Sequence, residues 1–268
     1  MKRNATEMTK KKVLVVGSEK LLAEFQQRST LNGTVQYFDP VEEVVFERES
    51  SPDSITDEFA EITTLMARTL VNSAKEISLD QVDIVFDLEF DDIPDNFEEY
   101  LKYPHLIVFG RAVKKSLAEI VLSIDLEFEC TLFGINSIPT FINRPLLEVS
   151  LMREEDRLKL AAITRDLGIE TEIVADDIGM VTPRIVFMII NEAYFLVGEG
   201  SANRNDVDRA MKLGTNYPMG PFEWAAKIGL HHIVSTLTNL HLASGDSRYK
   251  IAPLLRREYL REAALSRD

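Results

Sequence analysis

The chain of 268 residues is long enough for two domains, and its 45% hydrophobic content is that of an ordinary globular protein. Its formal net charge of −14 argues against nucleic acid and anionic membranes as partners. No apolar run is long enough to cross a bilayer, and the polar, basic segment Met1–Lys12 is unlike a secretory signal. The single cysteine, Cys130, excludes an internal disulfide and is expected to be a buried small residue of a cytoplasmic protein.

The first elements follow a strand-helix-strand order. The apolar run 11–17 predicts a buried parallel strand that ends at Gly17, and Ser18 is placed to cap the helix that follows. A second strand at 34–39 ends in Asp39. NAD-binding domains have this arrangement, in which Gly17 would begin the phosphate loop and Asp39 would contact the adenosine ribose.

The phosphate loop departs from the pattern of such domains. Where two further glycines are expected after Gly17, the chain has Glu19 and Leu22. Glu19 would place a negative charge beside the pyrophosphate, and two anions about 4 Å apart repel by roughly 1 kcal/mol in water. We infer that the Glu19 carboxylate fills the anion site itself, while the neighbouring Lys20 leaves weak dinucleotide binding open.

Further strands and helices alternate along the chain. We expect strands at 82–90, 106–110, 130–135 and 170–175, and helices at 58–70, 91–103, 116–122 and 152–167. Gly168 is expected to cap the last of these helices. The alternation predicts an α/β fold with a doubly wound, mostly parallel sheet. Only helices are predicted from Gly179 onward, so the expected domains are residues 1–178 and 179–268.

The second domain begins with a strongly apolar helix. The run 185–197 is apolar on nearly every face, so we expect it to be central and buried. Asn205 or Asp206 is placed to cap the next helix, and Gly214 to end it. Pro221 is suited to the first turn of the helix after that.

Two stretches of this domain carry a resemblance to a known family. The sequence DVDRAMKLGTNYPMGPFEWAAKIGL at 206–230 closely resembles the C-terminal domain of the 3-hydroxyacyl-CoA dehydrogenases, and INEAYFLVGEG at 190–200 resembles the first helix of that domain. The resemblance implies an NAD-dependent oxidoreductase of fatty-acid and butanoate metabolism. It also implies a Rossmann-type domain at 1–178 and a helical dimerisation domain at 179–268, which would form a homodimer.

The resemblance further implies where the catalytic residues should lie. Family members pair a histidine base with a glutamate, and these positions fall here on Asn136 and Glu148. Asparagine cannot act as a base near neutral pH. The family's substrate-binding serine falls on the basic turn 111–115, and its junction asparagine falls on Pro183, next to Thr182, which is expected to point elsewhere.

The histidines that are present do not replace the missing base. His105, His231, His232 and His241 are each expected to be surface or packing residues, and no cluster has the spacing of metal ligands, so no metal is predicted. Glu148 can equally be a structural acid.

Two functions remain open. The favoured one is a 3-hydroxyacyl-CoA dehydrogenase-like pseudoenzyme with degraded NAD and catalytic motifs, which keeps a cleft for an acyl-CoA or another small ligand. Arg111, Lys114 and Lys115 would offer that ligand positive charge, or form a solvated basic turn. The alternative is a working NAD-dependent 3-hydroxyacyl-CoA (3-hydroxybutyryl-CoA) dehydrogenase with a rearranged active site that uses Glu148.

Overall fold

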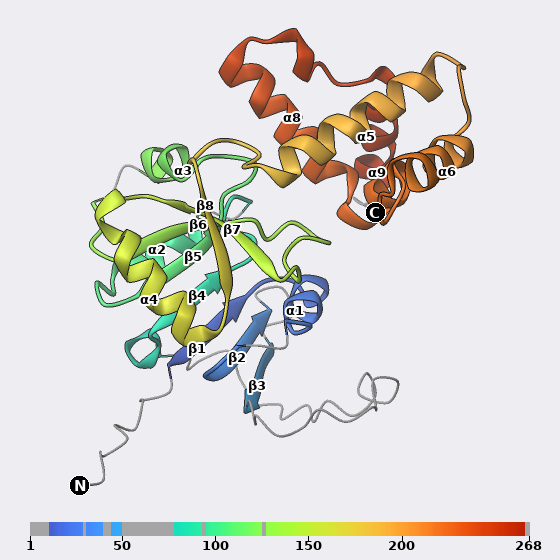
Figure 1. Ribbon diagram of the computed structural model, residues 1–268. Helices are drawn as coiled ribbons and strands as arrows, with labels where there is room; N and C mark the ends of the chain where they lie inside the picture. Colours follow the sequence, from blue (N-terminus) through green and yellow to red (C-terminus); the bar gives the residue numbers. More distant parts are fainter. Residues whose placement is uncertain are drawn as a thin grey trace, which may run out of the picture.

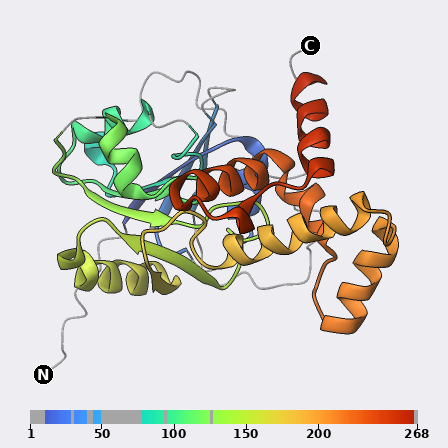
Figure 2. The same ribbon diagram turned by 90° about the horizontal axis from the view of Figure 1, so that it is seen from above.

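The computed structural model describes residues 11–28, 31–39, 44–49, 78–92, 95–124 and 127–265. These residues form an α/β part followed by a helical part, and the two lie side by side in both views (Figures 1 and 2). The helix predicted at 58–70 lies outside the described residues. None of the helices that the structure describes is long and apolar enough to span a membrane.

Within the described residues, eight strands form one sheet in the order β3-β2-β1-β4-β5-β6-β7-β8. The strands are β1 Lys12–Val16, β2 Thr34–Asp39, β3 Val44–Glu49, β4 Ile84–Asp87, β5 Ile107–Arg111, β6 Thr131–Ile135, β7 Leu146–Leu151 and β8 Glu170–Val174. Neighbours are parallel except for the pairs β2–β3 and β6–β7. The mostly parallel sheet is therefore confirmed, whereas β3 and β7 were not predicted.

Hydrophobic cores cover both faces of the sheet, as a doubly wound fold requires. The flanking helices are α1 Glu19–Phe25, α2 Asp95–Leu101, α3 Leu117–Ile124 and α4 Arg157–Leu167. One core lies between the sheet and helices α1 and α4. The other begins under α3 and continues into the helical part, so the two parts share a core. Gly168 caps α4 in the left-handed conformation, as predicted.

The cysteine lies in the shared core. Cys130 is 0% exposed, which confirms the expected small buried residue. Burial raises the pKa of its thiol to about 11, so the group stays protonated and unreactive at neutral pH.

The helical part consists, among the described residues, of α5 Thr182–Gly198, α6 Arg204–Thr215, α7 Pro221–Ile228, α8 Leu230–Ser244 and α9 Pro253–Leu265. Helix α5 is central, because it packs against the other four. It is not buried on every face as expected, since Ile185 is 57% exposed. The last strand ends at Val174 and α5 begins at Thr182, on either side of the expected boundary.

The ends of α6 differ from those predicted. Asn203, rather than Asn205 or Asp206, caps its start by accepting a hydrogen bond from the Asp206 N–H at 3.0 Å. The helix continues through Gly214 and ends at Asn216, which adopts a left-handed φ of 58°. Asparagine adopts this conformation more readily than most residues, so the chain did not need a glycine there.

Pro221 begins α7 as predicted, and α6 caps this helix. The Asp208 carboxylate accepts hydrogen bonds from the N–H groups of Phe222 at 2.8 Å and Glu223 at 3.2 Å. A side chain at Gly220 would overlap that carboxylate, because a Cβ there would lie 2.2 Å from the Asp208 Cγ. The most recognisable stretch of the sequence is thus a corner that joins two helices.

Candidate functional site

The candidate site lies where β1, β4, β5 and β6 end, at the edge of the sheet that faces the helical part. Two interdomain hydrogen bonds locate this contact: Lys20 Nζ donates to the Lys227 carbonyl at 3.2 Å, and Asn239 Nδ2 donates to the Lys114 carbonyl at 2.8 Å. Parallel α/β sheets bind ligands at the carboxyl ends of their strands. The residues predicted for cofactor binding and catalysis would therefore lie at this edge.

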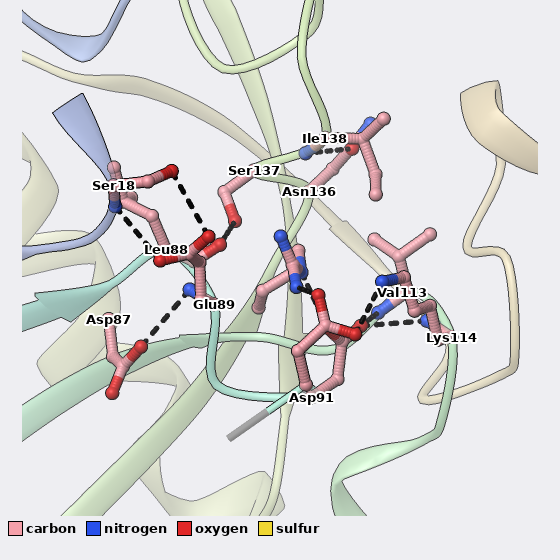
Figure 3. Close-up of polar contacts among 12 residues, drawn as sticks. Ser18, Asp87, Leu88, Glu89, Asp91, Val113, Lys114, Asn136, Ser137 and Ile138 are labelled. Atoms are coloured by element: carbon pink, nitrogen blue, oxygen red, sulfur yellow. Dashed lines mark hydrogen bonds and ion pairs between the residues drawn. The ribbon is translucent and has the colours of Figure 1, made fainter. Parts of the chain in front are cut away.

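A carboxylate occupies the start of α1, but it belongs to Glu89 (Figure 3). The Ser18 N–H donates to Glu89 Oε2 at 2.8 Å, and the Ser18 hydroxyl donates to Glu89 Oε1 at 3.1 Å. Glu19, which the sequence analysis placed there, is exposed. Strand register explains the difference: Val16 lies opposite Asp87, so the residues two positions further on, Ser18 and Glu89, also meet.

The turn that carries Glu89 is held from several sides. The Asp87 carboxylate accepts hydrogen bonds from the Glu89 N–H at 3.1 Å and from the Tyr100 hydroxyl at 2.9 Å. Burial and the neighbouring Asp87 raise the pKa of Tyr100 well above its ordinary value, so its hydroxyl keeps the donated proton. Leu88 lies over Gly17, where an added Cβ would be 3.1 Å from the Leu88 Cβ. The turn is thereby fixed against the first residue of the phosphate loop.

Gly17 and Asp39 lie close together at the ends of β1 and β2. The Gly17 N–H donates to the Phe38 carbonyl at 3.1 Å, which places Asp39 next in line. Asp39 is only 3% exposed and lies opposite Val44 of β3 in the sheet. The strand-helix-strand arrangement from which Gly17 and Asp39 were predicted is therefore present. Asp39 is buried beside β3, the strand that was not predicted.

Asn136 and Glu148 are neighbours through the antiparallel pair β6–β7. The Asn136 N–H donates to the Glu148 carbonyl at 3.2 Å. The Asn136 side chain is buried, and its Oδ1 accepts a hydrogen bond from the Ile138 N–H at 3.4 Å (Figure 3). The fold thus brings together Asn136 and Glu148, the two positions that the resemblance assigns to the catalytic pair. The Asn136 side chain, however, binds the backbone of its own loop at Ile138.

The Glu148 carboxylate binds the start of α5. It accepts hydrogen bonds from the N–H groups of Val181 at 3.3 Å and Thr182 at 2.9 Å, and from the Thr182 hydroxyl. The expectation that Thr182 points elsewhere is therefore wrong. Carboxylates are favourable at helix N-termini, where N–H groups lack partners within the helix. Glu148 acts here as a cap that joins the sheet to the helical part.

The basic turn after β5 is buried and paired with acids. Arg111 Nε donates to Asp91 Oδ1 at 2.5 Å, and Asp92 forms ion pairs with Arg111 Nη2 and Lys114 Nζ. Asp91 also accepts the N–H groups of Val113 at 3.0 Å and Lys114 at 2.8 Å (Figure 3). Arg111 and Lys114 are thus neither a solvated turn nor free charges awaiting an anionic ligand, because Asp91 and Asp92 neutralise them.

The pKa shifts follow from this pairing. Burial alone would lower the pKa of Arg111 and raise that of Asp92, but the opposite charges of the pairs outweigh it, so the pKa of Arg111 is raised and that of Asp92 lowered. Burial and the nearby Arg111 lower the pKa of Lys114. Arg111 and Asp92 therefore remain charged at neutral pH and hold each other in place.

Two histidines at the start of α8 lie against this network. The ring centroids of His231 and His232 are 3.7 Å apart. Burial and the nearby cations lower the pKa of both rings, to about 4 for His231. His105 and His241 are exposed, as expected of surface histidines, and each contacts a backbone carbonyl elsewhere. Sequence spacing gave no sign that His231 and His232 would meet Asp92, because the two segments are far apart in the chain.

Comparison with known sequences supports the resemblance of the helical part to the 3-hydroxyacyl-CoA dehydrogenases. Residues 179–266 match the family model described as 3-hydroxyacyl-CoA dehydrogenase, C-terminal domain. A probable 3-hydroxybutyryl-CoA dehydrogenase of Bacillus subtilis is 37% identical over 123 residues, which cover 46% of this chain and 43% of that protein. The 3-hydroxyadipyl-CoA dehydrogenase of Escherichia coli is 44% identical over 90 residues, covering 34% and 19%. The matches span less than half the length of these curated relatives.

Solved structures share the fold over nearly the whole chain. The (S)-3-hydroxybutyryl-CoA dehydrogenase of Ralstonia eutropha has a TM-score of 0.63 at 21% identity, covering 92% of this chain and 93% of that one. FadB2 of M. tuberculosis has a TM-score of 0.66 at 19% identity, covering 96% and 95%. At such identities the likeness establishes the fold, a Rossmann-type sheet followed by a helical domain.

Proposed function

We propose that this chain, whose residues 179–266 match the C-terminal domain model of the 3-hydroxyacyl-CoA dehydrogenases, keeps the fold of this family without its hydride-transfer reaction. The observation that carries the proposal is the Glu89 carboxylate on Ser18, at the place where a dinucleotide phosphate would bind. In this proposal the protein is a scaffold, or a binder of an acyl-CoA or another small ligand.

The residues at the start of α1 do not fit NAD. The Ser18 donors that would face a pyrophosphate already bind an anion, and Glu89 would have to leave before a phosphate could take its place. Two anions about 4 Å apart repel by about 1 kcal/mol in water and about 4 kcal/mol in a partly buried site. Leu22 occupies the position of the third glycine of the phosphate-loop pattern, and its side chain is buried against the sheet.

The positions that the resemblance assigns to the proton-transfer pair offer no base. Asn136 cannot accept a proton near neutral pH. The Glu148 carboxylate is engaged by three donors of α5, so it is not directed toward an incoming hydroxyl group. A dehydrogenase of this family needs a base for the substrate hydroxyl proton, and in our proposal neither Asn136 nor the Glu148 carboxylate supplies it.

The helical domain supports the remaining part of the proposal. Its corner sequence lies within the range that the family model matches, and it joins α6 to α7 by hydrogen bonds to Asp208 rather than presenting a reactive group. We infer that this domain forms a homodimer, as the resemblance implies, and that the fold was retained for assembly while the chemistry was lost.

The test combines cofactor binding with turnover. NADH is titrated into the purified protein up to millimolar concentration while its fluorescence is followed, and acetoacetyl-CoA reduction is then assayed with NADH. We expect no saturable NADH binding and no turnover. Turnover on the order of 10 per second, the median for enzymes, would instead establish the alternative of a working dehydrogenase with a rearranged site.

A further inference from the structure

Three side chains with metal-ligand atoms gather at the interdomain contact. Asp92, in the loop after β4, and His231 and His232, in the first turn of α8, bring their nitrogen and oxygen atoms within 4.8 Å of one another. Atoms that each lie roughly 2 Å from one ion are at most about 4 Å apart, so these three need to approach one another by less than about 1 Å to share an ion. The group comprises two imidazoles and one carboxylate from both parts of the molecule.

One of these side chains is buried with a ring nitrogen that has no partner among the described residues. His232 is 5% exposed, and its Nδ1 has no hydrogen-bond partner among the described residues. A buried polar atom left unpaired costs about 1–3 kcal/mol. Native structures therefore rarely leave one unless an ion or a water is bound there.

We propose that Asp92, His231 and His232 form a binding site for a divalent transition-metal ion, for which Zn²⁺ is the fitting cation. Zn²⁺ prefers imidazole and carboxylate ligands, and three protein ligands leave its fourth position to water. The ion would also join the two parts of the molecule, since its ligands come from both sides of the interdomain contact.

Lys114 is the chief competitor of the metal. Its ammonium pairs with Asp92 Oδ1, while Arg111 pairs with the other carboxylate oxygen. A carboxylate can accept about four hydrogen bonds, so Asp92 can keep Arg111 while a metal takes over the oxygen that Lys114 holds. Removal of the Lys114 charge should therefore strengthen metal binding. If Asp92 served only as the ion-pair partner of Lys114 and Arg111, this removal would have no effect on a metal.

The test uses full-length protein without a histidine tag. Co²⁺ is titrated while its visible absorption is recorded, and Zn²⁺ binding is measured by isothermal titration calorimetry. We expect one ion per chain, Co²⁺ bands that Zn²⁺ abolishes, and a loss of affinity of at least about tenfold in His232→Ala and in Asp92→Asn. The Lys114→Met variant should bind more tightly than the wild type.

The matched control is His105→Ala, which removes an exposed histidine outside the group and should leave binding unchanged. Far-UV circular dichroism checks that each variant is folded. Asp92→Asn, in which the substituted side chain is 37% exposed and nearly isosteric, decides the matter if His232→Ala does not fold. The proposal is overturned if folded wild type binds no ion, or if Asp92→Asn binds it as His105→Ala does. In either case a bound water is the remaining partner for the His232 nitrogen.

Discussion

The backbone N–H of Ser18 donates a 2.8 Å hydrogen bond to the Glu89 carboxylate, at the start of the first helix after the first strand. In this fold that place receives the phosphates of a dinucleotide. The chain has instead supplied an anion of its own, and the contact is set by the register of β1 and β4. In our proposal, cofactor binding therefore depends on Glu89, a residue that lies outside the phosphate-loop motif.

Removal of the Glu89 carboxylate should improve dinucleotide binding. We expect the Glu89→Ala variant to show NADH binding that the wild type does not show up to millimolar concentration, because relief of about 1.4 kcal/mol of repulsion strengthens binding about tenfold. Fluorescence titration measures the change. The matched control is Glu19→Ala, which removes an exposed acid from the same helix start and should change affinity little. A larger gain in NADH affinity in Glu19→Ala than in Glu89→Ala would support the sequence-based inference that Glu19 fills the anion site.

Substitution of Glu148 should reduce stability. In Glu148→Ala the N–H groups of Val181 and Thr182 lose their acceptor, so we expect the free energy of unfolding to fall by about 2 kcal/mol, the upper end for a lost helix cap. Urea denaturation followed by circular dichroism measures it. Glu172, opposite Glu148 on β8, is exposed and provides the control Glu172→Ala. Unchanged stability in Glu148→Ala would contradict the capping role.

Breaking the buried ion pairs should cost more. In Arg111→Met the Asp91 and Asp92 carboxylates lose their buried partner, and removal of one member of a buried pair costs about 3–5 kcal/mol. Thermal and urea unfolding should both show the loss. Lys115→Met, at a partly exposed position of the same turn, should change stability by less than about 0.5 kcal/mol. Equal stability of the two variants would show that the ion pairs contribute little.

The unpaired histidine predicts a pH dependence of stability. Because burial lowers the folded-state pKa of His232 below its ordinary value near 6.5, the unfolded chain binds more protons as the pH falls through that value. Stability should therefore be fully present above about pH 6.5 and be lost progressively below it, by up to about 1.4 kcal/mol per pH unit.

Urea unfolding at pH 7, 6 and 5, with a chelator present, measures this dependence. Asp92 contributes little in this range, because its carboxyl has a lowered pKa and titrates at more acid pH. His231, whose pKa is lowered to about 4, causes a loss of the same sign, so His232→Leu should reduce the dependence between pH 7 and 5 without abolishing it, whereas His105→Gln should leave it unchanged. An unchanged slope in His232→Leu would show that other groups cause the loss.

Much of the fold was determined by local patterns in the sequence. Apolar β-branched runs at 11–17 and 106–110, each followed by a helical pattern, were enough to predict a parallel sheet, because burial on both faces selects such residues. The proline corner at Pro221 was predicted for a similarly local reason, since its fixed φ and missing N–H suit a first helical turn. The family resemblance resided in the same corner.

Tertiary structure decided what the local patterns left open. Strand β7 was missed because Glu148 and Ser150 interrupt its apolar run, and these polar residues are buried only because Thr182 and Asp176 bind them. The carboxylate at the start of α1 comes from Glu89 and not from the predicted Glu19, because the register of β1 and β4 brings Glu89 beside Ser18. Asp92 meets His232 through docking of the two parts. Backbone preferences act over a few residues and can be read along the chain, whereas these contacts join distant segments and exist only once the sheet and the helices have packed.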